Sequence, residues 1–459
     1  MNSAGGERMK VAPNDSDTPS RPLTDPARAK TRLDVIADYV PSEIPEYAGN
    51  EFIEALGTIR SRKDLAKLMS YHPPYDHLER QQPAHVRKHL MLRLKRLYEP
   101  LTDQNNIAQT LSEMIYSGYV HRTPSSPQFH QFLQQSYLAR LRGATEQIED
   151  VDVMCDSYAI IGVSGVGKSR LTRRGLAQFP KLIWHPKLRM YQIPYLIVEC
   201  PYNGTVRQLA LNFFSELDKI ARTNYEVRFS KRNMTVEDLI REINAAAHLF
   251  GIGLIIIDEI QHAKAASGSS SEQKFLNFIV RFVNTSVAPV VMIGTMSSLG
   301  MLQSDFRQAR RTIGALLSNH KQDHEWNHFL TTLWSYQWTK KVCPLNEDLN
   351  NAMYERTQGV LDLAVKLYQY VQRRAIDCKS EEIDVKLIHL VADEELTRVA
   401  PMVDALKTGD MAKLARYGDL TLPEFQICPT DIETSTVHGI SLSQLIGAMK
   451  VHDDARNLK

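Results

Sequence analysis

Residues 162–169 read Gly-Val-Ser-Gly-Val-Gly-Lys-Ser and match the pattern G-x-x-x-x-G-K-[ST] in full. The four residues before this stretch, Tyr-Ala-Ile-Ile, are typical of a buried strand, and residues 169–178 are typical of a helix. Glycines allow backbone N–H groups to approach phosphates closely, and the N-terminus of a helix adds a positive dipole. The order of strand, glycine-rich loop and helix therefore favours a phosphate-binding loop over a chance glycine turn that holds a lysine.

The residues of this loop have distinct expected roles toward a nucleoside triphosphate. Lys168 would reach the β- and γ-phosphates during catalysis, and Ser169 would ligate Mg²⁺. The predicted contacts with ATP are Gly162, Val163, Ser164, Gly165, Val166, Gly167, Lys168, Ser169 and Arg170.

A second motif consists of an apolar run that ends in two acids, Leu-Ile-Ile-Ile-Asp-Glu at residues 254–259. Asp258 would hold Mg²⁺ through water, and Glu259 would polarise the water that attacks the γ-phosphate. The alternative is a buried strand that ends in two solvated acids. The phosphate loop earlier in the chain favours the catalytic interpretation, and Glu259 favours a hydrolase over a simple nucleotide-binding switch.

Two further features complete the expected set of ATPase residues. Thr295 ends another apolar run and would contact the γ-phosphate or the attacking water, although it could also cap the next helix. Arg310 and Arg311 are candidates for an arginine finger that reaches the ATP of a neighbouring subunit. The alternative for both arginines is an exposed basic face, and the sequence does not choose between them.

The helix expected after Gly359 carries a possible second sensor. Many ATPases of this kind have an arginine in this helix that reaches the nucleotide, but here Asp362 stands at that position. Lys366 lies one turn later on the same helix face and could partly substitute. Lys366 is therefore a candidate nucleotide contact.

The composition of the 459-residue chain is that of a globular protein. Hydrophobic residues make up 43% and charged residues 24%, which excludes a disordered chain, a collagen-like repeat and a coiled-coil rod. No apolar run approaches the ~18 residues that a membrane span needs. The net charge of +2 gives no overall signal for nucleic acid, so any basic surface must be local. Five scattered cysteines and the lack of a signal peptide predict a cytoplasmic location.

The pattern of apolar runs predicts an α/β fold with a mainly parallel sheet. Four nearly continuous runs, at residues 158–161, 195–198, 254–257 and 290–293, are typical of strands that are covered on both faces. We expect a disordered tail over residues 1–30, a helical accessory domain or wrapped helices over 31–145, the ATPase core over 146–320, a helical lid over 321–398 and a C-terminal arm over 399–459. The arm includes a helix expected over residues 400–417.

Several blocks of sequence resemble TnsC, the AAA+ regulator of cut-and-paste transposons that have a separate target selector, and more distantly the TniB proteins. The resemblance covers roughly residues 45–420, and its blocks are residues 50–56, 117–124, 161–169, 211–214, 258–262, 293–295, 357–367 and 415–420. The ATPase motifs are common to many proteins. Asp-Glu-Ile-Gln-His at 258–262 and Gln-Gly-Val-Leu-Asp at 358–362 are more specific.

The resemblance implies an AAA+ P-loop core and a mechanism. ATP-bound protomers would assemble into a ring or helical filament around duplex DNA. A target-selection protein of the TnsD or TniQ type would nucleate or cap this assembly, which would then recruit transposase subunits of the TnsA and TnsB type. ATP hydrolysis would dismantle the assembly. By analogy, the C-terminal arm would dock a transposase subunit.

The resemblance also implies contacts with the DNA backbone. Arg207 matches a basic position at the start of a helix, and Lys231, Arg232 and Thr235 match a second contact. Contacts of this kind are independent of sequence and weaken with salt. The alternatives are a solvated surface for Arg207 and a plain helix cap for Thr235.

Two other functions remain open at this point. One is a helicase-loading or replication-loading ATPase, which the helical block around residues 50–56 disfavours. The other is an ATP-gated scaffold with negligible hydrolysis, which Glu259 and the candidate finger disfavour. The sequence leaves open the number of subunits and whether the selector is a DNA-binding protein or an RNA-guided complex.

Overall fold

The computed structural model describes residues 34–142, 156–202, 204–231, 234–265, 269–298, 312–379, 381–410, 413–414, 436–437 and 440–441. The chain forms two compact units, residues 1–418 and residues 419–459. In the second unit, β9 (Thr436–Val437) pairs antiparallel with β10 (Ile440–Ser441). The first unit contains the sheet and the candidate site.

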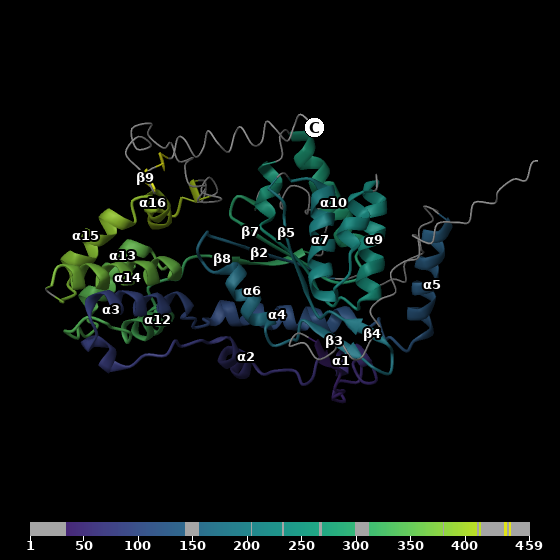
Figure 1. Ribbon diagram of the computed structural model, residues 1–459, viewed down its shortest axis with the longest axis horizontal. Helices are drawn as coiled ribbons and strands as arrows, with labels where there is room; N and C mark the ends of the chain where they lie inside the picture. The colour runs from purple at the N-terminus through teal and green to yellow at the C-terminus, as the bar shows by residue number, and fades with distance from the viewer. Residues whose placement is uncertain are drawn as a thin grey trace, which may run out of the picture. The chain divides into compact units, whose positions relative to one another are not determined.

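A five-stranded parallel sheet forms the centre of the first unit (Figure 1), in the order β5-β6-β7-β2-β8. Its strands are β2 (Ser157–Gly162), β5 (Leu196–Glu199), β6 (Ile255–Asp258), β7 (Val290–Thr295) and β8 (Thr312–Leu317). The four strands that the apolar runs predicted are confirmed, and β8 is an additional edge strand. Because the strands are parallel, their carboxyl ends meet at one edge, where Gly162 pairs with Thr295 and Glu199 with Asp258.

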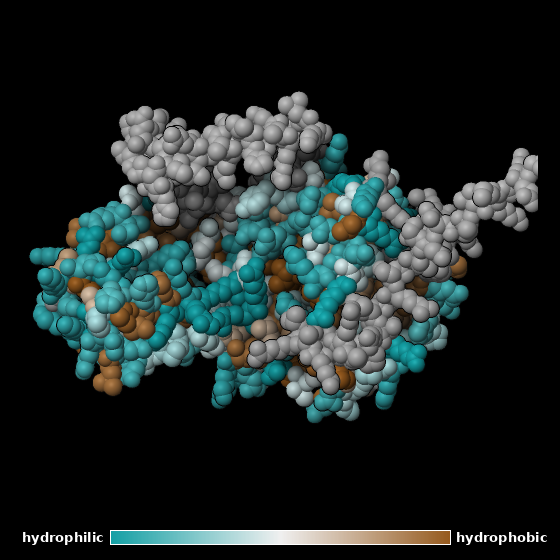
Figure 2. Space-filling view, in the orientation of Figure 1, coloured by the Kyte–Doolittle hydropathy of each residue, from teal (hydrophilic) through white to brown (hydrophobic). Residues whose placement is uncertain are grey.

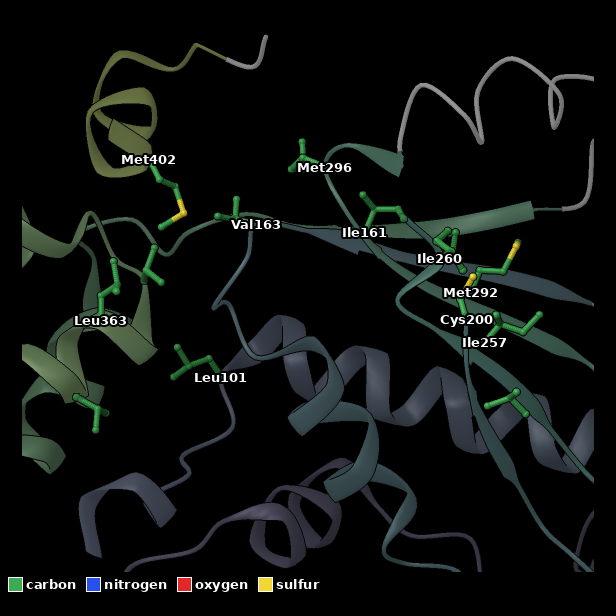
Figure 3. Packing of buried hydrophobic residues seen from close by; sticks show 14 of the residues in the cluster. Leu101, Ile161, Val163, Cys200, Ile257, Ile260, Met292, Met296, Leu363 and Met402 are labelled. Carbon is green, nitrogen blue, oxygen red and sulfur yellow. The ribbon is translucent and has the colours of Figure 1, made fainter. Parts of the chain in front are cut away.

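Alternate residues of the strands pack into two different apolar clusters, as the two-residue period of a strand requires. Ile161, Ile257 and Met292 lie in the first cluster (Figure 3), which α7 (Val206–Ala221), α9 (Val236–Leu249) and α10 (Ser269–Thr285) cover. Ile160, Ile256 and Val291 lie in the second, which α4 (Thr102–Tyr119) and α6 (Lys168–Leu176) cover. Both faces of the sheet are therefore buried.

The segment before the sheet, residues 34–142, is the N-terminal region. Its elements are β1 (Asp34–Ile36), α1 (Glu51–Glu54), α2 (Arg62–Met69), η3 (His77–Gln81), α3 (Ala84–Leu90), η4 (Met91–Arg96), α4 and α5 (Pro127–Arg142). β1 joins β3 (Leu182–His185) and β4 (Met190–Gln192) in a small second sheet. Because Ile107, Leu111 and Ile115 of α4 share a core with the main sheet, this region packs on the sheet instead of forming a separate core.

We use the name lid for the helices that follow the sheet within residues 321–398. They are α12 (His324–Trp334), α13 (Glu347–Thr357), α14 (Leu361–Asp377) and α15 (Val385–Glu395), and α16 (Ala400–Thr408) follows in the segment predicted as the C-terminal arm. The side chains of Asp323, Asn346 and Asp384 accept backbone hydrogen bonds at the starts of α12, α13 and α15, as preferred N-cap residues do. The helix expected over 400–417 ends early, because Gly409 takes a positive φ of 67° and closes α16.

The N-terminal region also holds the lid. Arg87 of α3 is 2% exposed and forms a bidentate ion pair with Glu381, at 2.8 and 2.7 Å. The same guanidinium donates to the carbonyl oxygen of Trp338 at 2.7 Å. Elsewhere in the region, Arg174 of α6 donates to the carbonyl oxygen of Met69 in α2 at 2.7 Å. The N-terminal region is thus bonded both to the lid and to the helix that follows the phosphate loop.

Hydrophilic residues predominate on the face of the molecule drawn in Figure 2, where apolar residues occur only in small groups. Scattered apolar residues of this kind are normal on the surface of a globular protein. The apolar residues that fill the two clusters are buried.

Candidate nucleotide-binding site

The loop between β2 and α6 depends on its glycines. Gly165 and Gly167 have φ angles of +80° and +96°, which glycine adopts without the steric cost of a Cβ atom. A Cβ atom on Gly162 would lie 2.4 Å from the carbonyl oxygen of Leu317 in β8, so no side chain fits there. The N–H group of Val163 donates to the same carbonyl at 3.2 Å, which ties the loop to the edge strand.

Lys168 lies inside the curve of this loop. Its side chain is 9% exposed, and Nζ donates to the carbonyl oxygens of Gly162 and Val163, both at 3.0 Å. Helix α6 begins at Lys168, so its first N–H groups, which have no partner within the helix, lie beside the ammonium. Ser164 and Val166 complete the loop. This geometry is what a phosphate-binding site requires.

Asp258 ends β6 next to the loop and is 4% exposed. Burial raises the pKa of this carboxyl and nearby Glu259 adds to the rise, whereas hydrogen bonds from the Ser169 side chain and the Glu259 N–H group, and the charge of Arg173, oppose it. The Glu259 N–H group donates to Oδ1 at 2.9 Å. A buried carboxylate with a raised pKa is stabilised by any cation that binds beside it.

The oxygens of Ser169 and Asp258 fit Mg²⁺, which prefers hard oxygen ligands. The hydroxyl and the carboxylate are hydrogen-bonded to each other, so one ion could contact both or bind through water. Within the described part of the chain, no group of three His, Cys, Asp or Glu side chains could hold a metal alone. This fits a Mg²⁺ site that substrate phosphates and water complete.

Glu259 adopts a φ angle of +59°, a sparsely populated conformation for a residue with a side chain. Its carboxylate accepts a hydrogen bond from the side-chain amide of Gln261, and the oxygen of that amide accepts from the N–H group of Thr295 at 3.2 Å. Gln261 therefore links Glu259 to the end of β7. Gln261 was not among the predicted site residues, although it belongs to the specific block 258–262.

Thr295 lies where the sequence predicted, at the carboxyl end of β7 beside Gly162. It is 3% exposed, and its hydroxyl lies 2.8 Å from the hydroxyl of Ser297. The loop, the acid pair and Thr295 thus meet at one edge of the sheet.

The start of α14 also contacts this edge. A Cβ atom on Gly165 would lie 3.5 Å from Val360 and 3.9 Å from Asp362. Lys366 forms an ion pair with Asp362 at 2.5 Å, so the two residues considered for the second sensor are bonded to each other. The guanidinium of Arg170 lies 5.1 Å from the ring centroid of Tyr98, over the aromatic face. Burial lowers the pKa of Arg170, and the charge of Asp362 opposes this shift.

The predicted DNA contacts lie after β5. Arg207, in the first turn of α7, donates to the carbonyl oxygen of Ser230 at 2.7 Å, which brings it beside Lys231 at the end of α8 (Tyr225–Ser230). Thr235 caps α9: its hydroxyl accepts from the Asp238 N–H group at 3.2 Å and donates to the Asp238 carboxylate at 2.8 Å. Its geometry is that of a capping box.

Three of the predicted residues, Arg232, Arg310 and Arg311, lie outside the described residues.

Residues 154–302 match a family model described as an AAA domain. The match includes the phosphate loop, the acid pair and Thr295. Together with the mostly parallel five-stranded sheet, it shows that this chain contains an AAA+ P-loop core, as the sequence predicted.

Among solved structures, the chain is similar to a Walker-type ATPase of Pyrococcus abyssi, with 14% identity over 62% of this chain and 74% of that one and a TM-score of 0.38. It is also similar to the Thermotoga maritima RuvB Holliday junction branch migration motor, with 14% identity, 61% and 76% coverage and a TM-score of 0.31. The Drosophila ORC bound to DNA matches with 13% identity, 69% and 75% coverage and a TM-score of 0.31. Similarities with such low sequence identities and TM-scores do not indicate a function. No curated protein matches the chain.

None of the described helices is long and apolar enough to cross a membrane.

Proposed function

We propose that this chain hydrolyses ATP and uses hydrolysis as a switch in a DNA-bound regulator of transposition of the TnsC type. The proposal depends mainly on one observation. The two most specific sequence blocks of the resemblance, residues 258–262 and 358–362, both lie at the candidate nucleotide site. Gln261 of block 258–262 bonds both Glu259 and Thr295, and Asp362 of block 358–362 lies against Gly165. Both blocks thus contact the nucleotide site, as expected of a family that shares one ATP-dependent mechanism.

The residues of the site would act on ATP as follows. The loop N–H groups and the start of α6 bind the phosphates, and Lys168 exchanges its loop carbonyls for phosphate oxygens. Ser169 and Asp258 would hold Mg²⁺, which would supply positive charge beside the phosphates. Glu259 orients the attacking water and accepts its proton, and Thr295 approaches the γ-phosphate from the neighbouring strand.

Assembly would complete the site. Arg310 or Arg311 would reach the ATP of a neighbouring protomer as an arginine finger, and Lys366 would serve as the second sensor. Residues 31–145, 146–320 and 321–398 would be the accessory domain, the ATPase core and the lid. Residues 399–459 would dock a TnsA- or TnsB-like transposase subunit, and a TnsD- or TniQ-like protein would select the target, in the cytoplasm.

Contacts with duplex DNA are assigned to Arg207 and Lys231, together with Arg232. The bond between Arg207 and the end of α8 keeps the first two side chains on one surface, where they would neutralise phosphates without reading bases. Thr235 has its hydroxyl engaged with Asp238, so we assign it an indirect role in fixing the start of α9 next to the basic residues.

Negative-stain microscopy of the full chain with duplex DNA, with and without a non-hydrolysable ATP analogue, tests this function. We expect rings or filaments that need both DNA and nucleotide, and that are absent in Lys168→Ala. Discrete particles that are indifferent to DNA would contradict the proposal and favour a loader-like ATPase. Phosphate release in parallel separates a hydrolase from an ATP-gated scaffold, because a scaffold would assemble without turnover.

A further inference from the structure

The turn after β5 contacts the short helix that follows the catalytic acid. The ring centroid of Tyr202 lies 3.9 Å from that of His262 in η5 (Ile260–Ala265), with 30° between the ring planes. Tyr202 is 78% exposed. The Tyr202 side chain is therefore mostly exposed to solvent and stacks on the ring of His262. This contact fixes its position, which exposure to solvent would not do.

His262 connects this contact to the nucleotide site. Its backbone N–H group donates to the carbonyl oxygen of Glu259 at 3.0 Å, and its Nδ1 atom lies 3.1 Å from the carbonyl oxygen of Cys200 at the end of β5. The residue before it, Gln261, binds the Glu259 carboxylate. Any rotation of η5 therefore moves the backbone and the side-chain partner of Glu259 together.

On the side away from His262, hydrogen bonds of the residues that flank Tyr202 lead toward the proposed DNA surface. The N–H group of Gly204 donates to the carbonyl oxygen of Pro201 at 2.9 Å and closes a turn around Tyr202. Thr205 caps α7 by accepting from the N–H group of Gln208 at 3.3 Å, and Arg207 lies in the first turn of that helix. A shift of Arg207 toward a phosphate would be passed on through the Thr205 cap and the hydrogen bond between Gly204 and Pro201.

We propose that Tyr202 is a positioning residue that couples DNA bound at Arg207 and Lys231 to Glu259 through His262. The coupling rests on the proposed function, because it needs DNA on this surface. Glu259 already has a strained backbone and a carboxylate fixed by one amide, so a small rotation of η5 changes where the carboxylate points. Displacement of a catalytic group by about 1 Å can change a rate about 100-fold, which makes such a rotation sufficient.

The test compares ATP turnover of the full chain with and without duplex DNA, while fluorescence anisotropy measures DNA binding in the presence of a non-hydrolysable ATP analogue. In Tyr202→Ala we expect the ratio of DNA-stimulated to basal turnover to fall close to one, with basal turnover and DNA affinity within twofold of the unchanged protein. Tyr202→Phe keeps the ring and should keep the ratio. Leu78→Ala, which removes another exposed apolar side chain, is the matched control.

A double-mutant cycle tests the route. In a His262→Ala background, Tyr202→Ala should have no further effect on the stimulation ratio, because the ring partner is gone. Additive effects of the two changes would show that Tyr202 acts by another path and would overturn the proposal.

The outcomes separate this inference from the function on which it rests. If the unchanged protein binds DNA but DNA does not alter turnover, or if Tyr202→Ala is stimulated normally, the coupling is wrong and the DNA-bound function stands. If the unchanged protein does not bind DNA in any nucleotide state, the proposed function fails first and the coupling fails with it.

Discussion

The edge of the sheet at the candidate nucleotide site and the joint between the N-terminal region and the lid both bury charged groups, but the charges are compensated to different degrees. At the joint, the charge of Arg87 is matched by Glu381, and two further N–H groups of its guanidinium donate to the carbonyl oxygens of Gln82 and Trp338. At the edge, Asp258 is buried beside a second acid and its pKa is raised. Charge is fully compensated where the chain holds itself together, and is left partly uncompensated where a cation and a nucleotide would bind.

The largest effect should be on turnover at the edge. In Glu259→Gln we expect ATP hydrolysis to fall about 100- to 10,000-fold, because the amide cannot accept a proton from water. Binding of a fluorescent ATP analogue and the melting temperature should be unchanged. Glu226→Gln, an acid outside the site, serves as a control and should hydrolyse ATP normally. Turnover of Glu259→Gln within tenfold of the unchanged protein would exclude Glu259 as the base.

At the joint the large effect should be on stability. Arg87→Ala should lower the free energy of unfolding by about 3–5 kcal/mol, because Glu381 and two carbonyl groups lose their buried partner. Denaturant unfolding measures this free energy, and ATP turnover of the remaining folded protein should change little. The double variant Arg87→Met, Glu381→Leu should lose less unfolding free energy than Arg87→Ala alone. A loss below about 1 kcal/mol would show that the ion pair does not hold the lid.

A buried histidine predicts acid sensitivity where α5 of the N-terminal region packs on α9. His248 lies between the rings of Phe129 and Phe132, at 4.3 and 4.1 Å, and burial, with the charge of Arg122, lowers its pKa to about 2. The unfolded chain binds this proton near pH 6.5, so stability is complete above that pH and falls as the pH decreases, by up to about 1.4 kcal/mol per unit.

His248→Phe should reduce this pH dependence of the unfolding free energy without removing it, because burial also lowers the pKa values of His185 and His320. Unfolding curves at pH 7 and pH 5 for both proteins measure the difference. If the unfolding free energy of His248→Phe changed with pH as much as that of the unchanged protein, His248 would be able to bind a proton in the folded state.

Asp258→Asn at the edge should have an effect on stability opposite to that of Arg87→Ala at the joint. Because burial raises the pKa of Asp258, the folded state keeps this proton to a higher pH than the unfolded state, and stability falls as the pH rises through that interval. At pH 7 and without Mg²⁺, the neutral side chain should therefore stabilise the protein by roughly 1 kcal/mol while hydrolysis is lost. A lower melting temperature would mean that the ionised carboxylate is already compensated.

The smallest effect on stability is expected at Lys366. Its ion pair with Asp362 is about half exposed, so Lys366→Ala should change the unfolding free energy by less than about 0.5 kcal/mol. If Lys366 is the second sensor, the KM for ATP should rise a few-fold in steady-state kinetics. An unchanged KM would remove Lys366 from the site.

The sequence predicted β2, β5, β6 and β7 and the motifs at their ends, because strands whose two faces are both covered are apolar along most of their length. It did not predict β8, an edge strand whose Leu316 is 53% exposed and whose Gly314 lies where a Cβ atom would come within 2.9 Å of the carbonyl oxygen of Ala159. Exposed and small residues weaken the apolar signal of β8, whereas β5 at the opposite edge keeps a continuous apolar run at residues 196–198.

The contacts that the motif residues make with other side chains could also not be predicted from the sequence. Gln261 acquires its role only because β6 and β7 lie side by side, which brings the N–H group of Thr295 within reach. Similarly, Arg170 faces Tyr98 and Asp362 because residues from three distant segments meet there. Spacing along the chain indicates which residues can do chemistry, whereas their partners follow from packing.

The packing of α4 on the main sheet has a consequence for synthesis in the cell. α4 is complete at Tyr119, but β7, which contributes Val291 and Ile293 to the same apolar cluster, begins only at Val290. The ribosome must therefore make residues 120–289 before the apolar face of α4 is fully covered. At about 5–20 residues per second this takes roughly 10 to 30 seconds. During that interval the nascent chain presents Ile107, Leu111 and Ile115 to chaperones, and its folding has to wait for translation of the sheet.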